Sequence, residues 1–303
     1  MDWESWLRNS AAPPSDHEDS KRERTEKQIR DALKSHEPLQ DRDYVVYAKG
    51  SYANNTNVRL DYDVDIAVEY RGYFYSDLAF ELEGMPDSSV GVVSSTDSYS
   101  VADFKRDIRL ALEVAFGKSA VKPGRIAFRV REQKTTLPAD VVPCWEYRRY
   151  DRIKNGEPVY HQGARIFPSS GWPINNYPGI QLENGKDKNS GFRTGGRYKR
   201  MTRALKRLQT RLVDDGLLED SLPSYLIECL VYNVPDDSFG HSTYKADMRA
   251  VLARIFNSTL ASGDWNDWHE VHELKYLFRG DCDWTHQQVH RLADAAWNEM
   301  GFE

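Results

Sequence analysis

Two acidic residues, one residue apart, open a segment whose alternation is typical of a β-strand. In DVDIAVEY, residues 63–70, Asp63 and Asp65 stand on one side of that alternation. The positions between and after them are apolar: Val64, Ile66 and Val68. Since side chains at i and i+2 of a strand point to the same face, the two carboxylates share a face and the apolar residues pack behind them. Two like charges side by side require a cation, and hard carboxylate oxygens suit Mg²⁺, which also binds substrate phosphates.

A third carboxylate, Asp140, lies in LPADVVPC, an apolar stretch that predicts another strand. An acid within an apolar strand is costly to bury, which favours a functional explanation. Three carboxylates around one point could hold two metal ions and support an in-line phosphoryl transfer. The alternative is that Asp63 and Asp65 face solvent on an exposed strand. Asp61 follows the same alternation but precedes the apolar run, and we interpret it as a turn residue.

The acids need a sheet to position them, and the first half of the chain is patterned for one. A helix is expected over 16–36, where charged residues surround a narrow apolar stripe of Ile29 and Leu33. The other elements expected before residue 150 are strands over 44–50, 63–70, 125–132 and 137–147, a loop-dominated region over 71–100 and a helix over 101–117. The last two strands are expected to pair antiparallel. This interleaving predicts an α/β or α+β domain with a mixed sheet.

The arrangement of Gly50-Ser51, then D-x-D on a strand, then a lone aspartate on a later strand resembles the DNA polymerase β-like nucleotidyltransferase superfamily. The resemblance implies that Gly50 and Ser51 grip the triphosphate of a nucleotide, and a hydroxyl beside glycine backbone suits an anion. It also implies that Asp63, Asp65 and Asp140 are catalytic and bind two Mg²⁺ ions, for which Mn²⁺ could substitute.

The second half of the chain is patterned mainly for helices. Residues 155–196 are rich in Gly, Pro and Asn, and we expect them to be loop-like. Helices are expected over 197–214, 222–232, 243–256, 266–278 and 285–299. The predicted fold is therefore α+β, with a polymerase β-like nucleotidyltransferase lobe plus a C-terminal helical lobe. The first domain, with the N-terminal helix, is expected over 1–185 and the helical domain over 186–303.

A strongly basic segment opens the helical lobe. Residues 188–213 contain nine Lys or Arg residues and no acid. Their apolar stripe consists of Met201, Ala204, Leu205, Leu208 and Leu212, as in an amphipathic helix. Lys199, Arg203 and Lys206 recur at i, i+4 and i+7, so they could project together. The alternative is a solvated charged face, although so one-sided a run is unusual in an acidic protein.

The next helix, in LPSYLIECLVYNVP, opens with Ser224 and Tyr225. Ser224 in the first turn could reach a phosphate. Tyr225 could stack on a base, a contact worth about 1–3 kcal/mol in nucleic-acid binders. The alternative is a helix cap followed by a packed tyrosine.

Together, these stretches and NNYPGIQLENGKDKN resemble one branch of the superfamily, the cGAS/DncV-like nucleotidyltransferases of bacterial anti-phage (CBASS) systems. The resemblance implies that Lys206 and Ser224 bind the donor triphosphate and that Tyr225 stacks on its base. Lys199 and Arg203 compete with Lys206 for that role. Two further residues, Asn175 and Asn176, could contact an acceptor base through their amides, or could be turn residues.

The implied activity is the synthesis of a cyclic oligonucleotide, with a cyclic dinucleotide as the expected product. The expected partners are NTP substrates (ATP and/or GTP, with UTP and CTP as further candidates) and a downstream effector that responds to the cyclic nucleotide. One alternative is a related enzyme that adds nucleotides to an RNA end or a protein side chain. Another is a sensor that binds nucleotides without turnover, against which the three aspartates argue.

Composition limits the remaining possibilities. A net charge of −6 argues against a stable nucleic-acid complex, and no run of 18 apolar residues predicts a membrane span. The acidic N-terminus lacks a signal-like apolar region, and Cys144, Cys229 and Cys282 are odd in number, so we expect a cytoplasmic protein. The family resemblance implies that this cytoplasm is bacterial. Cys282 with His286 and His290 leaves a structural zinc site as an open alternative.

Overall fold

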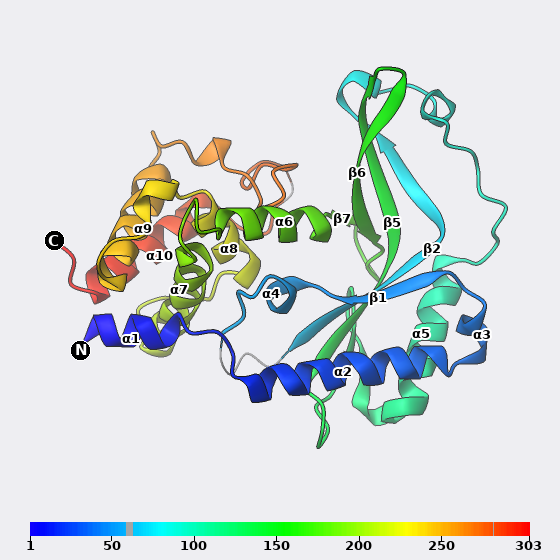
Figure 1. Ribbon diagram of the computed structural model, residues 1–303, viewed down its shortest axis with the longest axis horizontal. Coiled ribbons are helices and arrows are strands. Elements are labelled where there is room, and N and C mark those ends of the chain that lie inside the picture. Colours follow the sequence, from blue (N-terminus) through cyan, green and yellow to red (C-terminus); the bar gives the residue numbers. More distant parts are fainter. Residues whose placement is uncertain (59–62, 281) are drawn as a thin grey trace. The chain divides into compact units, whose positions relative to one another are not determined.

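The computed structural model describes residues 1–58, 63–280 and 282–303 of the chain, whose path is shown in Figure 1. The chain divides into two compact units, each built from separate segments. Unit 1 comprises Met1–Ser15, Gly50–Asp61 and Ile180–Glu303, and unit 2 comprises Asp16–Lys49 and Tyr62–Gly179. The domain boundary expected at residue 185 stays a prediction.

Unit 2 is built on one sheet. Its seven described strands are β1 (Tyr44–Ala48), β2 (Val64–Leu78), β3 (Val121–Pro123), β4 (Phe128–Val130), β5 (Ala139–Lys154), β6 (Glu157–Ile166) and β7 (Ile174–Asn176). The order is β1-β2-β5-β4-β3, with β6 beside β5 and β7 beside β6. β2 and β5 run parallel, and the other pairs are antiparallel, including the predicted β4–β5 pair. The prediction of a mixed sheet is confirmed.

Helices cover one part of this sheet. They are α2 (Asp16–Lys34), the short α3 (Glu37–Gln40) and α5 (Val101–Phe116). α2 packs against α5, β1 and β2, and α5 packs against β3, β4 and β5 (Figure 1). Ile29 and Leu33 of α2 are fully buried, as their spacing predicts. α5 begins at a capping box between Ser100 and Asp103 and ends at Gly117, whose φ of 88° only glycine adopts readily.

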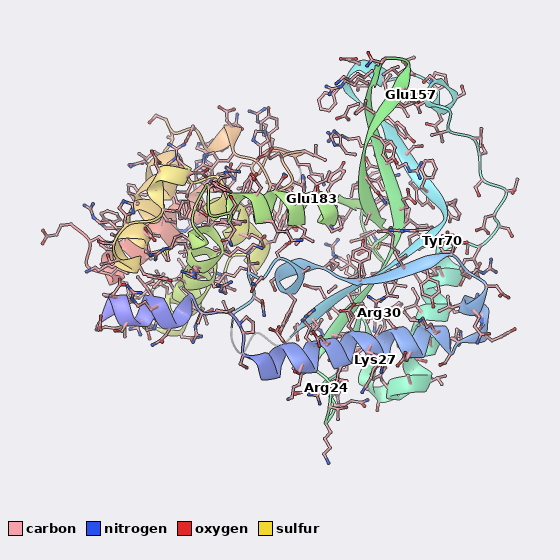
Figure 2. The ribbon with its side chains drawn as sticks, in the orientation of Figure 1. Arg24, Lys27, Arg30, Tyr70, Glu157 and Glu183 are labelled. Carbon is pink, nitrogen blue, oxygen red and sulfur yellow. The ribbon has the colours of Figure 1, made fainter. Side chains whose placement is uncertain are left out.

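Two segments expected to be loops extend the sheet instead. β2 continues through residue 78 before the 3₁₀ turns at Phe80–Leu82 and Asp87–Val90. β5 continues beyond the strand predicted over 137–147 and forms a long hairpin with β6, which lies in the segment expected to be loop-like, as do β7 and α6. Asn155 and Gly156 join its strands with φ angles of 53° and 83°, which an Asn-Gly turn supplies at low cost. Figure 2 labels Glu157, the first residue of β6 after this turn.

Aromatic rings fill the space between α5 and the middle of the sheet. Phe104 of α5 lies 5.2 Å from the ring of Tyr70 (labelled in Figure 2) and 5.3 Å from that of Trp145, measured between centroids. These are edge or tilted contacts, the arrangement that aromatic quadrupoles favour. Since Tyr70 and Trp145 are register partners on β2 and β5, the cluster holds the parallel pair together beyond its hydrogen bonds.

Unit 1 is helical. Its elements are α1 (Trp3–Ser10), α4 (Gly50–Ala53), most of α6 (Pro178–Lys188), α7 (Arg197–Asp214), α8 (Ser224–Tyr232), α9 (Tyr244–Ser258) and α10 (His286–Glu299). Helices α7 to α10 confirm four of the five helices predicted after residue 196. α1 was not predicted, and it packs on α7 and α9 of the same unit although the sequence analysis groups its residues with the first lobe. Among the described residues, no helix combines the length and the apolar character needed to cross a bilayer.

The apolar stripe of α7 forms the centre of the unit 1 core. All five residues predicted for it are fully buried: Met201, Ala204, Leu205, Leu208 and Leu212. They pack in one cluster with residues of α1, α8, α9 and α10. Truncating one such leucine to alanine typically costs about 2–5 kcal/mol, so this stripe is a main source of the unit's stability.

The helix predicted over 266–278 is wrong. The segment contains a 3₁₀ turn at Trp265–Asp267, an isolated bridge between His269 and Tyr276, and no α-helix. The side chain of Asn233, just after α8, donates to the carbonyl of His269 and accepts from its N–H at 2.7 and 3.0 Å. This tertiary contact takes the backbone groups that a helix would have paired within itself.

We predict that the three cysteines differ sharply in reactivity. Burial raises the pKa of Cys144 to about 12 and raises that of Cys229 well above its usual value, whereas Cys282 is partly exposed. Because the thiolate is the reactive species, titration of the native protein with a disulfide reagent should show one fast thiol, and denaturant should release the other two. Cys282→Ser should abolish the fast phase. Two or more fast thiols in the native protein would contradict the burial described here.

Candidate active site

The register between β2 and β5 brings two of the predicted carboxylates together. In this parallel pair Asp65 lies opposite Asp140, so both side chains point to the same face of the sheet. Adjacent strands lie about 4.8 Å apart, which places both carboxylates within reach of one cation. Both residues are partly exposed, whereas Val64 and Ile66 are fully buried. At the start of β2 the structure therefore has the predicted alternation, with acids on one face and core on the other.

Arg129 joins this group, and the sequence analysis gave it no role. Its Nε and Nη2 lie 3.2 and 3.5 Å from the two carboxylate oxygens of Asp140. The hydrogen bond to Asp140, followed by the charges of Asp140 and Asp63, raises the pKa of Arg129. Asp63 itself is exposed and directly precedes β2. Asp61, interpreted as a turn residue, lies outside the described residues.

The carboxylates suit a hard divalent cation, although they form no complete protein cage. Over residues 1–58, 63–280 and 282–303, no three His, Cys, Asp or Glu side chains are grouped so that they could hold a metal ion. Mg²⁺ usually binds through one or two carboxylates plus substrate phosphates and water, so it needs no such cage. The Arg129–Asp140 ion pair would not prevent Asp140 from binding a cation. The arginine is 63% exposed, and exposed ion pairs contribute only about 0–1 kcal/mol to stability. The donor set therefore fits Mg²⁺ that arrives with a nucleotide.

The Gly50-Ser51 turn belongs to unit 1. It starts a compact segment of residues 50–57, the Gly50 loop, with a Gly50 φ of 67° in the left-handed region that favours glycine. The loop folds back on itself, because the Ser51 carbonyl accepts hydrogen bonds from the N–H groups of Thr56 at 2.9 Å and Asn57 at 3.2 Å. Ser51 remains half-buried, and its contact with phosphate stays a prediction.

The basic stripe of α7 is buried, so its interpretation as a solvated charged face is wrong. Lys199, Arg203 and Lys206 are 8%, 4% and 4% exposed. Arg203 Nη1 donates to the carbonyl of Asn55 at 2.5 Å, and Lys206 Nζ donates to the carbonyl of Thr56 at 3.0 Å. Two of the three cations thus contact the Gly50 loop directly. Direct contact of Lys206 with phosphate stays a prediction.

Burial also shifts the ionisation of this stripe. It lowers the pKa of Lys199, an effect that the charge of Glu228 opposes. Together with the neighbouring Arg200, burial lowers the pKa of Arg203 to about 10, so Arg203 keeps its charge at neutral pH. A cation with little solvation interacts more strongly with an anionic ligand than an exposed one does. Lys199 therefore remains a candidate for a phosphate contact.

Ser224 and Tyr225 open α8, as predicted, and their side chains differ in burial. Ser224 is exposed in the first turn, and Tyr225 is half-buried. Tyr225 Oη donates to Glu270 Oε2 at 2.6 Å, and His272 Nε2 lies 2.8 Å from the same oxygen. Burial alone would raise the pKa of Glu270, but His272 and the Tyr225 hydroxyl outweigh it and lower that pKa overall. The tyrosine is therefore anchored by its hydroxyl, and stacking of its ring on a base stays a prediction.

Asn175 and Asn176 lie on β7 of unit 2, so the alternative that they are turn residues is wrong. As neighbours on a strand they face opposite sides. The Asn175 amide is engaged within the sheet: its Oδ1 accepts from Arg165 Nε at 2.8 Å, and its Nδ2 donates to Asp77 Oδ2 at 3.3 Å. Contact of either asparagine with a base stays a prediction.

The side chains considered for a zinc site have other contacts. Cys282 Sγ donates to a backbone carbonyl at 3.3 Å. The ring of His286 stacks on Trp265 with centroids 4.0 Å apart, and His290 Nδ1 lies 3.0 Å from Thr259 Oγ1. Within the described part of the chain, these residues do not form a ligand cluster.

Family models match two separate stretches of the chain. Residues 26–119 match a nucleotidyltransferase domain. Residues 183–301 match the C-terminal helical domain of the cGAS/DncV-like nucleotidyltransferases. The first match runs from within α2 through α5 and includes the Gly50 loop of unit 1, and the second lies within unit 1.

Relatives match over nearly the full length. The chain is 37% identical over 301 residues to the cyclic dipyrimidine nucleotide synthase CdnE of Cecembia lonarensis, covering 99% of this chain and 98% of the relative. It is 38% identical over 300 residues to the enzyme of the same name from Legionella pneumophila, covering 98% of each. The solved structure of Rhodothermus marinus CdnE c-UMP-AMP synthase with Apcpp and Upnpp matches with a TM-score of 0.82 and 31% identity, covering 99% of this chain and 98% of that one.

We predict that Asp65→Asn weakens Mn²⁺ binding by at least about tenfold, or 1.4 kcal/mol, because it removes one of the few carboxylates available to the ion. Electron paramagnetic resonance of Mn²⁺ titrations, carried out in the presence of a non-hydrolysable nucleoside triphosphate analogue that completes the ligand set, measures this directly. Glu157→Gln, which removes one exposed negative charge at the β5–β6 turn, is the matched control and should leave Mn²⁺ affinity unchanged. Equal affinities for wild type and Asp65→Asn would refute the assignment.

We also predict a pH-dependent contribution of Glu270 to stability. Its folded pKa is lowered, so its ionised form stabilises the fold above the ordinary value of 4.5, and this contribution is lost as pH falls through the lowered pKa. Denaturant unfolding from pH 6 to pH 3.5 should show a steeper loss for wild type than for Glu270→Gln, which cannot titrate. Parallel pH profiles for the two proteins would contradict this prediction.

Proposed function

Because the chain belongs to the cGAS/DncV-like nucleotidyltransferase family, we propose that it joins two nucleoside triphosphates into a cyclic dinucleotide with release of pyrophosphate. The observation that carries the proposal is the in-register pair of Asp65 and Asp140 on β2 and β5, with Asp63 just before β2. Full-length similarity to enzymes named as cyclic dinucleotide synthases supports it.

In the proposed mechanism Asp63, Asp65 and Asp140 would hold two divalent ions, Mg²⁺ or Mn²⁺. Bound there, the ions would neutralise charge on the phosphates and lower the pKa of the attacking hydroxyl. Asp140 accepts the proton of that 2′- or 3′-hydroxyl as it attacks the α-phosphorus. Arg129 supplies a positive charge beside Asp140.

In unit 1 the same proposal assigns nucleotide-binding roles. Gly50 and Ser51 contact the triphosphate. One of the three α7 cations, Lys199, Arg203 or Lys206, offsets the negative charge of the triphosphate, and Ser224 contacts it through its hydroxyl. Tyr225 stacks on the base, with its ring orientation held by the hydrogen bond to Glu270. The linear dinucleotide formed first would then rebind with its ends exchanged. Both bond-forming steps are nucleotidyl transfers, so one set of residues serves both.

We further propose that at least one of the two bases is a pyrimidine. Two relatives at 37% and 38% identity are named as dipyrimidine synthases, and the Rhodothermus structure contains a uridine nucleotide analogue. The amides of Asn175 and Asn176 are candidates to contact a base edge, since an amide offers both a donor and an acceptor. The cyclic product would act on a separate effector protein in the bacterial cytoplasm.

Incubation with labelled NTPs in all pairwise mixtures, with Mg²⁺ or Mn²⁺, tests this proposal. We expect a small phosphatase-resistant product containing at least one pyrimidine, identified by mass spectrometry, together with pyrophosphate. Replacing both Asp63 and Asp65 with Asn should reduce product by at least about 100-fold, the lower end of the loss seen when one preorganised charge-stabilising group is removed from an enzyme, without unfolding the protein. If the only products are extended RNA or nucleotidylated protein, the proposal is wrong and the chain is a nucleotidyltransferase with a different acceptor.

A further inference from the structure

Thr56, in the Gly50 loop, is held by charged side chains from two helices of unit 1. Its Oγ1 donates to Glu228 Oε2 of α8 at 2.9 Å. Its backbone carbonyl accepts from Lys206 Nζ of α7 at 3.0 Å. Thr56 is 0% exposed, and Glu228 and Lys206 are only 2% and 4% exposed. A neutral loop residue therefore lies between an acid and a base that are both removed from solvent.

Because Glu228 and Lys206 are buried, their charges require hydrogen-bond partners within the protein. A charge withdrawn from water is costly unless hydrogen bonds and an opposite charge compensate it. Gln181 Nε2 supplies Glu228 Oε1 with a second hydrogen bond at 3.4 Å, and Lys206 Nζ also lies 3.5 Å from Thr56 Oγ1. The hydroxyl of Thr56 thus connects the two charges, which a methyl group in its place could not do.

The same contacts restrain the backbone of the loop. Asn55 has a φ of 52°, in the left-handed region, and both Asn55 and Thr56 lie outside the helices and strands. Arg203 and Lys206, three residues apart on one face of α7, donate to the carbonyls of these two successive residues. On the inner side, the N–H of Thr56 donates to the carbonyl of Ser51. Holding Thr56 therefore holds Ser51.

We propose that Thr56, Glu228 and Lys206 form a positioning element that preorganises the Gly50 loop for the triphosphate. This inference rests on the proposed function, which makes Ser51 a phosphate contact. Thr56 and Glu228 need not touch the nucleotide. They act by keeping Ser51 and its backbone in one conformation before the nucleotide arrives, which removes an ordering cost from binding. In this element Lys206 acts through the loop carbonyl.

The central experiment compares Thr56→Val with Thr56→Ser. Valine keeps the shape but removes the hydroxyl, and serine keeps the hydroxyl. The probes are the α,β-imido analogue of UTP and the α,β-methylene analogue of ATP, each with Mg²⁺, in calorimetric titrations of the full chain. We expect Thr56→Val to weaken binding of the analogue that wild type binds by about tenfold, which corresponds to 1.4 kcal/mol, and Thr56→Ser to restore it to within about threefold.

Thr202→Val is the matched control. Thr202 of α7 is also 0% exposed, but its Oγ1 donates within its own helix, to the Tyr198 carbonyl at 2.9 Å. Both valine variants should lower the melting temperature, whereas only Thr56→Val should weaken nucleotide binding. Equal losses of melting temperature with unchanged affinity in both variants would reduce Thr56 to a purely structural role and overturn the inference.

Glu228→Gln is an independent test that removes the negative charge but keeps the side-chain volume, and it replaces Thr56→Val if that variant does not fold. Glu228→Gln alone should weaken analogue binding by a few-fold. If Thr56→Val folds, its effect should be smaller in the Glu228→Gln background than in wild type, because contacting residues are energetically coupled. Strictly additive effects, or a Glu228→Gln protein with wild-type affinity, would contradict the proposed element.

These measurements distinguish failure of the proposed cyclic dinucleotide synthesis from failure of the positioning element. If wild type binds neither analogue, the proposed function fails and the positioning element with it. If wild type binds an analogue and makes the cyclic product but Thr56→Val binds equally well, only the positioning element fails.

Discussion

The parallel pairing of β2 with β5 is the constraint on which unit 2 depends. It places Asp65 opposite Asp140 at one end and Tyr70 opposite Trp145 further along, where Phe104 of α5 packs on both rings. A shift of one residue along either strand would turn the acids into the core and the core residues toward solvent. The apolar packing of the pair therefore fixes where the charges lie. The stability of the sheet and the chemistry of its carboxylates are properties of one register.

Unit 1 depends on a different constraint, the burial of charge. Basic residues on α7 lie next to the apolar stripe that forms the core, so folding withdraws them from water as well. The carbonyls of the Gly50 loop compensate part of that cost for Arg203 and Lys206, and the charge of Glu228 does so for Lys199. The loop is consequently defined by contacts from α7 and α8 as well as by its own turn. The short helix α4 and the irregular residues 54–57 that follow it thus acquire one conformation.

Local signals were sufficient for much of the fold. The helix over 197–214 coincides with α7, and the capping residues of α5 and α10 mark starts close to those predicted. Errors arose where a tertiary partner decided the outcome. Asn233 took the backbone groups of His269, and the predicted helix over 266–278 did not form. The β5–β6 hairpin is different, because its Asn155-Gly156 turn is a local signal that the Gly, Pro and Asn content of the surrounding segment obscures.

The sequence by itself determined which chemistry is available. Local order gives the types and spacing of Asp63, Asp65 and Asp140. It also gives the glycine beside Ser51 and the basic helix with its apolar stripe. Alternation along a strand and periodicity along a helix need no knowledge of distant residues. Only the tertiary structure decided what those groups contact. It paired Asp140 with Arg129, buried the α7 cations and set Thr56 between Lys206 and Glu228. Burial and hydrogen-bond partners depend on segments far apart in the chain, so no local pattern could have specified them.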